Sequence, residues 1–201
     1  MVLAKHTDEE IIKGCKAGKR YFQNQLYEKY KRSLFSVCLR YAVNMQEAED
    51  ILQESFCKIF THIGDYKGQG SFEGWLKRIV INSTLSYLKQ NKKDPLRYNN
   101  VEKIEHVAEE EVEDEDDIFS NLSPQQCQTI LKFIQELPVG YRTVFNLYVF
   151  EGYSHQQIAQ ILQISENTSK SQLSKARRHL KNKILQWMEK GITTNKPNSS
   201  Y

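Results

Sequence analysis

The sequence predicts an all-helical protein of two domains joined by a flexible acidic linker. Apolar residues recur every three or four positions along most of the 201-residue chain, the spacing of helices that bury one face. Only nine glycines and four prolines are present, few for the turns that a β fold needs. Ten acidic residues crowd into residues 102–117, where no apolar period continues. One helical domain is therefore expected on each side of that run.

The N-terminal domain is expected to be a helical bundle over residues 1–93. Side-chain oxygens at a helix start can accept the free N–H groups of the first turn, and a capping box does so reciprocally. The expected helices are a short one from the capping box at Thr7–Glu10 to Gly18, a long one from Phe22 to Tyr41, one from the box-like Asn44–Glu47 to Ile63, and one from Ser71 that stops before Asp94 and Pro95.

Residues 94–122 are predicted to be a linker, and residues 191–201 a disordered tail. The segment 102–117 holds ten acids and one lysine, and like charges keep such a chain extended. Residues 1–101 hold 17 basic and 11 acidic residues, and residues 118–201 hold ten and four. Two basic lobes indicate a polyanion as partner, although solvated surfaces explain the charge alone equally well.

Several kinds of function find no support in the residue pattern. The four cysteines and five histidines show no metal-ligand spacing, and the cysteines fall inside helical apolar patterns. We expect no metal, no cofactor and no catalytic residue, and hence no enzyme. No apolar run is long enough for membrane insertion, and the N-terminus lacks the apolar core of a signal peptide. The expected location is the cytoplasm.

The C-terminal domain is expected to hold four helices over residues 123–190. Its first helix has Ser123 as N-cap and Pro124 at the first helical position, and Pro138 ends it. The other three are expected from Tyr141 to Phe150, from the capping box at Ser154–Gln157 to Leu162, and from Asn167 to about Trp187.

The last two of these helices have the spacing of a helix-turn-helix. Ala159 is small enough for the second helix to cross closely, and Ile164 is expected as a buried apolar plug in the turn. Ser165 can cap the second helix, whose first turn then suits a phosphate. Gln163 stands where glycine is usual, and a non-glycine residue in a left-handed conformation costs on the order of 1 kcal/mol.

The outer face of the last helix is basic and polar, which favours DNA binding over a helical hairpin with a merely solvated face. Lys170, Ser171 and Lys175 lie near the helix start, where side chains can reach base edges. Later cations suit phosphates, which position a protein without specifying sequence. The expected DNA-contacting set is Ser165, Asn167, Thr168, Lys170, Ser171, Ser174, Lys175, Arg177 and Arg178.

Three stretches carry a family resemblance. They are EAEDILQESFCKIF at residues 47–60, FEGWLKRIVINSTLSYLKQNKK at residues 72–93 and YSHQQIAQILQISENTSKSQLSKARRHL at residues 153–180. In this order they resemble the extracytoplasmic-function (ECF) sigma factors of the major sigma family, the smallest sigma subunits of bacterial RNA polymerase. The resemblance implies a promoter-specific transcription initiation factor.

Promoter DNA is the first partner that the resemblance implies. The last helix would read the −35 element, and the loop before Ser71 with the following helix would open the −10 element and trap a flipped base. An aromatic ring can stack on an extruded base, and an amide can pair with its edge. The implied −10 residues are Tyr66 and Asn82 for the base and Lys77, Arg78, Lys89, Lys92 and Lys93 for the strand backbone.

The polymerase core is the second implied partner. The helix after Asn44 would dock on the clamp helices of the largest subunit, and the flap region of the core is a further contact. An acidic patch on a basic domain suits a basic protein surface, because DNA would repel it. The linker would occupy the RNA-exit region, where ten carboxylates can mimic a polyanion. An anti-sigma factor is also implied. The core-binding residues would be Glu47, Asp50, Gln53 and Glu54.

Two expectations concern packing. Trp75 is expected in the core, whereas Tyr66, in a loop rich in glycine, has less reason to be there. Ser169 departs from the β-branched apolar residue that follows Thr168 in many relatives, so looser packing of the last helix is expected.

Two other functions remain open at this point. A stand-alone helix-turn-helix regulator would bind duplex DNA tightly without the core, usually as a dimer. A protein-interaction module would have no effect on transcription by the core.

Overall fold

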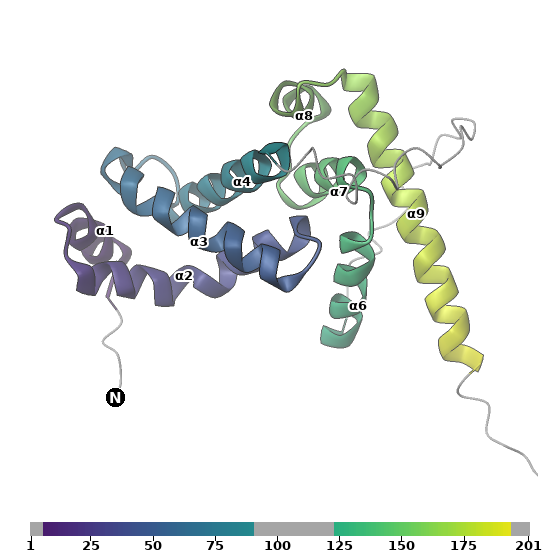
Figure 1. Cartoon of the computed structure of the whole chain (residues 1–201), viewed down its shortest axis with the longest axis horizontal. Helices are drawn as coiled ribbons and strands as arrows, with labels where there is room; N and C mark the ends of the chain where they lie inside the picture. The colour runs from purple at the N-terminus through teal and green to yellow at the C-terminus, as the bar shows by residue number, and fades with distance from the viewer. Residues whose placement is uncertain (1–5, 91–122, 194–201) are drawn as a thin grey trace, which may run out of the picture. The chain divides into compact units, whose positions relative to one another are not determined.

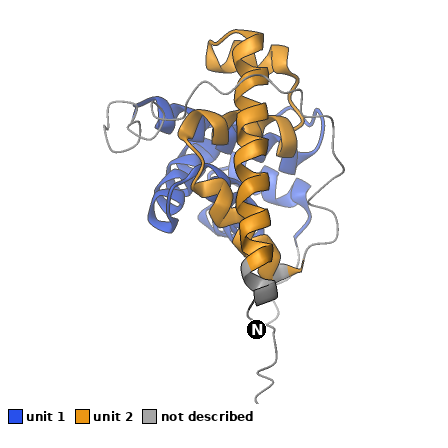
Figure 2. Ribbon diagram, turned by 90° about the vertical axis from the view of Figure 1, so that its right-hand side faces the viewer, with its two compact units in different colours: residues 1–94 blue, residues 95–201 orange. Residues whose placement is uncertain are grey.

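The computed structural model describes residues 6–90 and 123–193, which form helices and turns without a strand. The all-helical fold class is thereby confirmed for this part of the chain. The chain divides into two compact units, Met1–Asp94 and Pro95–Tyr201, which Figure 2 colours separately. The expected linker, most of the expected tail, and Lys92 and Lys93 lie outside the described residues.

The N-terminal unit is a bundle in which α2, α3 and α4 pack against one another and α1 packs on α2 (Figure 1). Its elements are α1 (Asp8–Lys16), α2 (Arg20–Tyr41), α3 (Met45–His62), the short 3-10 turn η1 (Ile63–Asp65) and α4 (Phe72–Gln90). Their apolar stripes meet in a core that excludes solvent. Fully buried members of this core are Leu26, Leu34, Ile51, Ile59, Leu76 and Val80.

Capping decides where α1 and α3 begin. Thr7 and Glu10 accept each other's backbone N–H groups, so the predicted capping box is confirmed. Asn44 accepts the N–H of Glu47 at 2.8 Å, but the Glu47 carboxylate takes the N–H of Val43 instead of that of Asn44. The predicted second capping box is therefore only half correct: Asn44 caps the helix, but the Glu47 carboxylate bonds to the N–H of Val43 and not to that of Asn44. The bond to Val43 draws Glu47 inward, and only 4% of this residue is exposed.

The C-terminal unit contains α6 (Pro124–Gln135), α7 (Val139–Phe145), the π-helical turn η3 (Asn146–Phe150), α8 (His155–Leu162) and α9 (Glu166–Thr193). Both α7 and α8 pack on α9, which is the longest helix of the described residues (Figure 1). The predicted N-cap Ser123 is present and forms a capping box with Gln126, and the capping box predicted at Ser154 is present as well. Helix α7 starts two residues earlier than expected, because Pro138 stands at its N-cap.

A buried arginine connects two helices of this unit. Arg142 on α7 is only 1% exposed, and its Nη1 donates to the carbonyl of Gln135, the last residue of α6. The last carbonyls of a helix lack partners inside the helix, so a guanidinium with five donors suits this position. The periodicity of the sequence does not reveal this contact.

Candidate nucleic-acid interface

The turn between α8 and α9 has the geometry expected of a helix-turn-helix. Gln163 is left-handed, with φ 59° and ψ 44°, the one non-glycine residue with positive φ among those described. The N–H of Ile164 bonds to the carbonyl of Ala159 at 3.1 Å, and Ser165 Oγ accepts the N–H of Thr168 at 2.9 Å. Ile164 is half-buried, so the plug is less enclosed than predicted.

The inner face of α9 holds Leu173, Ala176 and Leu180, all buried, and one polar residue. Ser169 has no solvent exposure, and its hydroxyl lies 2.9 Å from Nδ1 of His155 at the start of α8. A buried hydroxyl without a partner would cost about 1–3 kcal/mol. The expectation of looser packing at Ser169 is therefore wrong, because a histidine fourteen residues away satisfies the hydroxyl.

The outer face of α9 gathers the predicted DNA-contacting side chains. Lys170 is exposed and forms an ion pair of 2.9 Å with Glu166, one turn earlier. The guanidinium of Arg177 lies over the ring of Tyr148, 5.8 Å from its centroid. Two of the predicted residues, Ser165 and Asn167, are exposed. Five others are half-buried: Thr168, Ser171, Ser174, Lys175 and Arg178.

A histidine stands beside these cations. The His155 ring stacks on Tyr148 with centroids 4.6 Å apart. Burial lowers the pKa of His155 from its ordinary value, and the charges of Lys170 and Arg177 lower it further, while Glu166 opposes them. His155 is therefore mainly neutral at pH 7. Motif reasoning missed this residue, because nothing in its neighbouring sequence indicates a contact with Ser169.

The loop before α4 is held by an aromatic cluster in the N-terminal unit. The ring of Tyr66 lies 5.1 Å from that of Phe72 and 5.4 Å from that of Trp75, between centroids. Its hydroxyl donates to the carbonyl of Gly70 at 3.0 Å, and its own carbonyl accepts from Lys16 at 2.7 Å. Tyr66 and Trp75 are both half-buried, so the core position expected for Trp75 does not match the structure, whereas Tyr66 lies outside the fully buried core as expected.

The other predicted −10 residues lie along α4. Asn82 is exposed and follows Trp75 by seven residues, which is two helical turns on the same face and about 10 Å along the axis. Lys77 is paired with Glu73 at 3.0 Å, and Arg78 and Lys89 are exposed. The structure thus places Tyr66 against Trp75, and Asn82 farther along the same helix face.

The acidic face of α3 differs from the expected set in one member. Asp50 and Gln53 are exposed, and Glu54 pairs with Lys58 at 2.6 Å. Glu47, by contrast, is buried by its bond to Val43 and lies outside the exposed acidic surface. Helical spacing does not predict the burial of Glu47, because this burial arises from a bond to a backbone N–H just before the helix.

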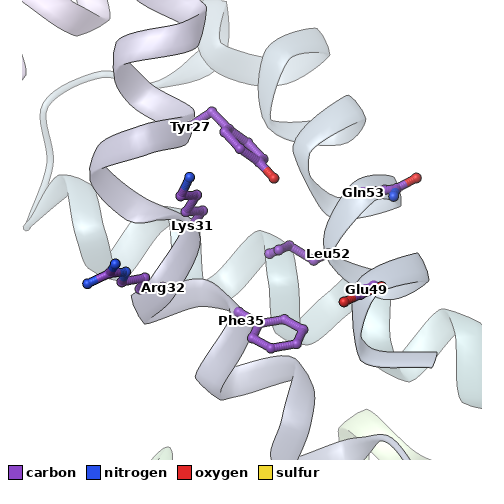
Figure 3. A pocket seen from close by; sticks show the side chains of 7 residues that line it. All are labelled: Tyr27, Lys31, Arg32, Phe35, Glu49, Leu52 and Gln53. Carbon is purple, nitrogen blue, oxygen red and sulfur yellow. The ribbon is translucent and has the colours of Figure 1, made fainter. Parts of the chain in front are cut away.

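An open groove of about 300 Å³ lies between α2 and α3 (Figure 3). Tyr27, Phe35 and Leu52 give it apolar walls, with Lys31 and Arg32 on the α2 side and Glu49 and Gln53 on the α3 side. Gln53 therefore belongs both to this groove and to the predicted core-binding set. No pattern in the sequence indicates this groove.

The described residues offer neither a metal site nor a membrane-spanning helix. No group of three or more histidine, cysteine or acidic side chains in residues 6–90 and 123–193 is placed to hold a metal ion. None of the helices in these segments has the length and apolarity of a membrane span.

A helix-turn-helix with a capped second helix and a basic outer face defines a DNA-binding protein. The model "Sigma-70, region 4" matches residues 127–180, which contain this motif, and the model "Sigma-70 region 2" matches residues 26–94. Together the two matches take up more than half of the chain. The chain is therefore a promoter-recognising transcription initiation factor of the sigma-70 type.

Curated relatives agree along nearly the whole chain. The RNA polymerase sigma-H factor of Pseudomonas aeruginosa is 28% identical over 186 residues, covering 88% of this chain and 93% of that protein. The ECF RNA polymerase sigma-E factor of Haemophilus influenzae is 28% identical, covering 89% and 95%. Among solved structures, the sigma factor RpoE of Bartonella quintana, in complex with the anti-sigma factor NepR, matches with a TM-score of 0.48 and 21% identity, covering 79% and 94%.

Proposed function

We propose that the chain recruits the polymerase core to a bipartite promoter, reading the −35 element with α9 and opening the −10 element with α4 and the loop before it. The single observation that carries the proposal is the helix-turn-helix formed by α8 and α9, which supports the reading of the −35 element. A left-handed turn at Gln163 and the cap at Ser165 set the first turn of α9, a helix on which Lys170 is exposed while Leu173 and Ala176 are buried.

At the −35 element, Lys170, Ser171 and Lys175 are proposed to read base edges. They lie in the first three turns of α9, the part of a recognition helix that enters the major groove. Lys170 can leave Glu166 at small cost, because exposed ion pairs are worth under about 1 kcal/mol. Phosphate contacts are assigned to Ser165, Asn167, Thr168, Ser174, Arg177 and Arg178.

At the −10 element, Tyr66 and Asn82 are proposed to hold the flipped base. Tyr66 belongs to a cluster of three rings at the start of α4, and an extruded base can stack on such a surface. Asn82 presents an exposed amide on the helix face that also carries Trp75. The strand backbone is assigned to Lys77, Arg78 and Lys89, and to Lys92 and Lys93 beyond the described residues.

The core is proposed to dock on the exposed side of α3, through Asp50, Gln53 and Glu54. Two features support this: carboxylates stand on a unit whose composition is basic, and an apolar groove opens beside Gln53. The carboxylates of Asp50 and Glu54 can steer a basic partner, and the groove can receive an apolar anchor. Glu47 is left out of this set because it is buried.

The remaining expectations follow from the role as a polymerase subunit. The chain is proposed to work in the cytoplasm as a binding factor without catalysis of its own, and to be restrained by an anti-sigma factor. The acidic segment 102–117 is proposed to occupy the RNA-exit region until the transcript displaces it. Replacing its acids with serine and glycine should weaken core binding or change abortive synthesis, and unchanged behaviour in both would rule this role out.

Run-off transcription tests the proposal. Bacterial core polymerase is combined with the full chain and a pool of promoter fragments with randomised −35 and −10 elements, and fragments that form open complexes are selected. Lys170→Ala should lower transcription from the selected promoter about tenfold, as expected for loss of one base contact. Asn82→Ala should lower promoter opening. Matched controls are Lys132→Ala on α6 and Asn24→Ala on α2, both exposed in the wild type.

The outcomes separate the alternatives. A stand-alone regulator would bind selected duplex DNA equally well without the core, and an interaction module would give no run-off product. Either result would contradict the proposal. Equal losses in Lys170→Ala and Lys132→Ala would contradict the assignment of α9 to the −35 element.

A further inference from the structure

A polar bond joins the two helices of the helix-turn-helix. Nδ1 of His155, the first residue of α8, lies 2.9 Å from the hydroxyl of Ser169, in the first turn of α9. The hydroxyl is completely buried, and the imidazole is half-buried. Apolar packing between helices is non-directional, whereas a hydrogen bond fixes both distance and orientation. This bond therefore constrains the start of α9 more narrowly than packing does.

The imidazole is itself held in place from a third element. Its ring stacks on Tyr148 of η3, with an angle of 24° between the ring planes. The guanidinium of Arg177 lies over the same Tyr148 ring, at 5.8 Å. Tyr148 thus connects His155 at the start of α8 with a cation on the outer face of α9.

Ser169 stands directly before the side chains proposed to read DNA. Its neighbours in sequence are Thr168 and Lys170, and Thr168 takes part in the N-cap through Ser165. A rotation or shift of α9 at Ser169 would move Lys170 and Ser171 relative to a base edge. Base readout requires donor and acceptor distances near 3 Å, so a small displacement suffices to lose it.

We infer that His155 is a positioning residue for sequence reading by α9, acting through its hydrogen bond to buried Ser169 and its stack on Tyr148. This inference rests on the proposed role of α9 at the −35 element. His155 holds the first turn of α9 at the depth and rotation that reading requires.

The test measures sequence discrimination separately from overall activity. Run-off transcription by the full chain with core polymerase is compared on two templates with the same −10 element, one with the selected −35 element and one with that element scrambled. The ratio of the two rates is determined for the wild type, His155→Ala, Ser169→Ala and the double variant. His179→Ala is the control, because it removes another half-buried histidine from the same unit.

Two further variants separate the hydrogen bond from ring volume. Asparagine can place a polar atom close to the position of imidazole Nδ1, whereas glutamine places one nearer to that of Nε2. His155→Asn should therefore keep the bond to Ser169, and His155→Gln should lose it. Thermal unfolding of each variant shows whether the unit remains folded, and if His155→Ala does not fold, the comparison of these two variants decides.

The ratio should fall about fivefold in His155→Ala and in Ser169→Ala, with no further fall in the double variant, because coupled residues are not additive. His155→Asn should stay within about twofold of the wild type, as expected of a retained bond, and His155→Gln should resemble His155→Ala. An unchanged ratio in His155→Ala, equal behaviour of the asparagine and glutamine variants, or additive losses would overturn the inference. A wild-type chain that does not distinguish the templates would instead overturn the proposed role of α9.

Discussion

Nζ of Lys16 donates a hydrogen bond of 2.7 Å to the backbone carbonyl of Tyr66, fifty residues later in the chain. Lys16 is the last residue of α1, and α1 lies outside residues 26–94, the part that matches sigma-70 region 2. The loop proposed to open the −10 element is therefore braced by a helix that precedes the matched domain.

The first prediction concerns this brace. Lys16→Met should lower the rate of promoter opening about two- to fivefold, because an exposed bond from a charged donor contributes roughly 0.5–1 kcal/mol. Core binding should not change, since Lys16 is not part of the α3 surface. Fluorescence of 2-aminopurine in the −10 element measures the opening. Lys13→Met on the same helix is the matched control, and an equal effect of the two substitutions would argue against the brace.

The second prediction concerns the start of α3. Glu47→Ala should lower the free energy of unfolding of the N-terminal unit by about 1–2 kcal/mol, because it leaves the N–H of Val43 without its carboxylate partner. Urea denaturation followed by circular dichroism measures this. Gln46→Ala, at an exposed neighbouring position, should change stability by less than about 0.5 kcal/mol. Equal stability of Glu47→Ala and the wild type would show that the bond to Val43 contributes nothing.

The third prediction concerns the left-handed turn. Gln163→Gly should stabilise the C-terminal unit by up to about 1 kcal/mol, because glycine adopts φ 59° without strain. Gln160→Gly, inside α8 and also exposed, should destabilise the unit by about 1 kcal/mol, because glycine is a poor helix former. The opposite signs of these two substitutions can be measured by denaturant unfolding. A loss of stability in Gln163→Gly would contradict the turn geometry.

The fourth prediction concerns pH. Burial lowers the pKa of His155, the charges of Lys170 and Arg177 lower it further, and Glu166 raises it in part. Burial likewise lowers the pKa of His179, the charge of Lys183 lowers it further, and Glu136 raises it in part. The folded unit therefore binds fewer protons than the unfolded chain just below the ordinary histidine pKa of about 6.5. Stability from these groups is fully present above that pH and is lost as pH falls through the lowered values.

Denaturant titrations of the full chain carrying Trp75→Phe, between pH 7.5 and about 5, test this prediction, because fluorescence of Trp187 then reports the unfolding of the C-terminal unit. Replacement of both histidines by alanine should flatten the dependence of stability on pH. A wild-type chain that gains stability as pH falls in this range would contradict the assigned direction of both pKa changes.

The fifth prediction concerns docking on the core. Asp50→Lys should weaken binding to core polymerase about tenfold, because it places a like charge against a basic partner. Glu9→Lys, an equal change of charge on exposed α1, should have little effect. Competition binding with labelled sigma factor measures both. Equal losses would mean that net charge, and not the α3 surface, governs affinity.

Elements governed by local rules could be predicted from the sequence, and contacts between distant residues could not. The helices and the side-chain caps at Thr7, Ser123 and Ser154 depend on groups three or four residues apart, so the sequence predicts them directly. The left-handed turn at Gln163 follows in the same way from helix-turn-helix spacing.

In the candidate site, the contacts that depend on tertiary structure could not be predicted. Glu47 and Asp50 share a helix face in sequence, yet only Asp50 is exposed, because Glu47 turns back to Val43. Ser169 suggested a packing defect, but its partner His155 lies on another helix. The ring contacts of Tyr66 with Phe72 and Trp75 are not apparent from its loop sequence, because they form only when α4 is in place. Each of these differences comes from tertiary contacts.

The ion pair of Lys170 with Glu166 has a consequence for how the protein searches a genome. On random DNA the first turn of α9 meets phosphates, and the Glu166 carboxylate is repelled by them while it also engages Lys170. We expect this to shorten each unproductive encounter. At a matching base edge Lys170 gains an acceptor that compensates for leaving Glu166. One acidic residue can thus raise selectivity by lowering the affinity for non-cognate DNA, without raising the affinity for the promoter.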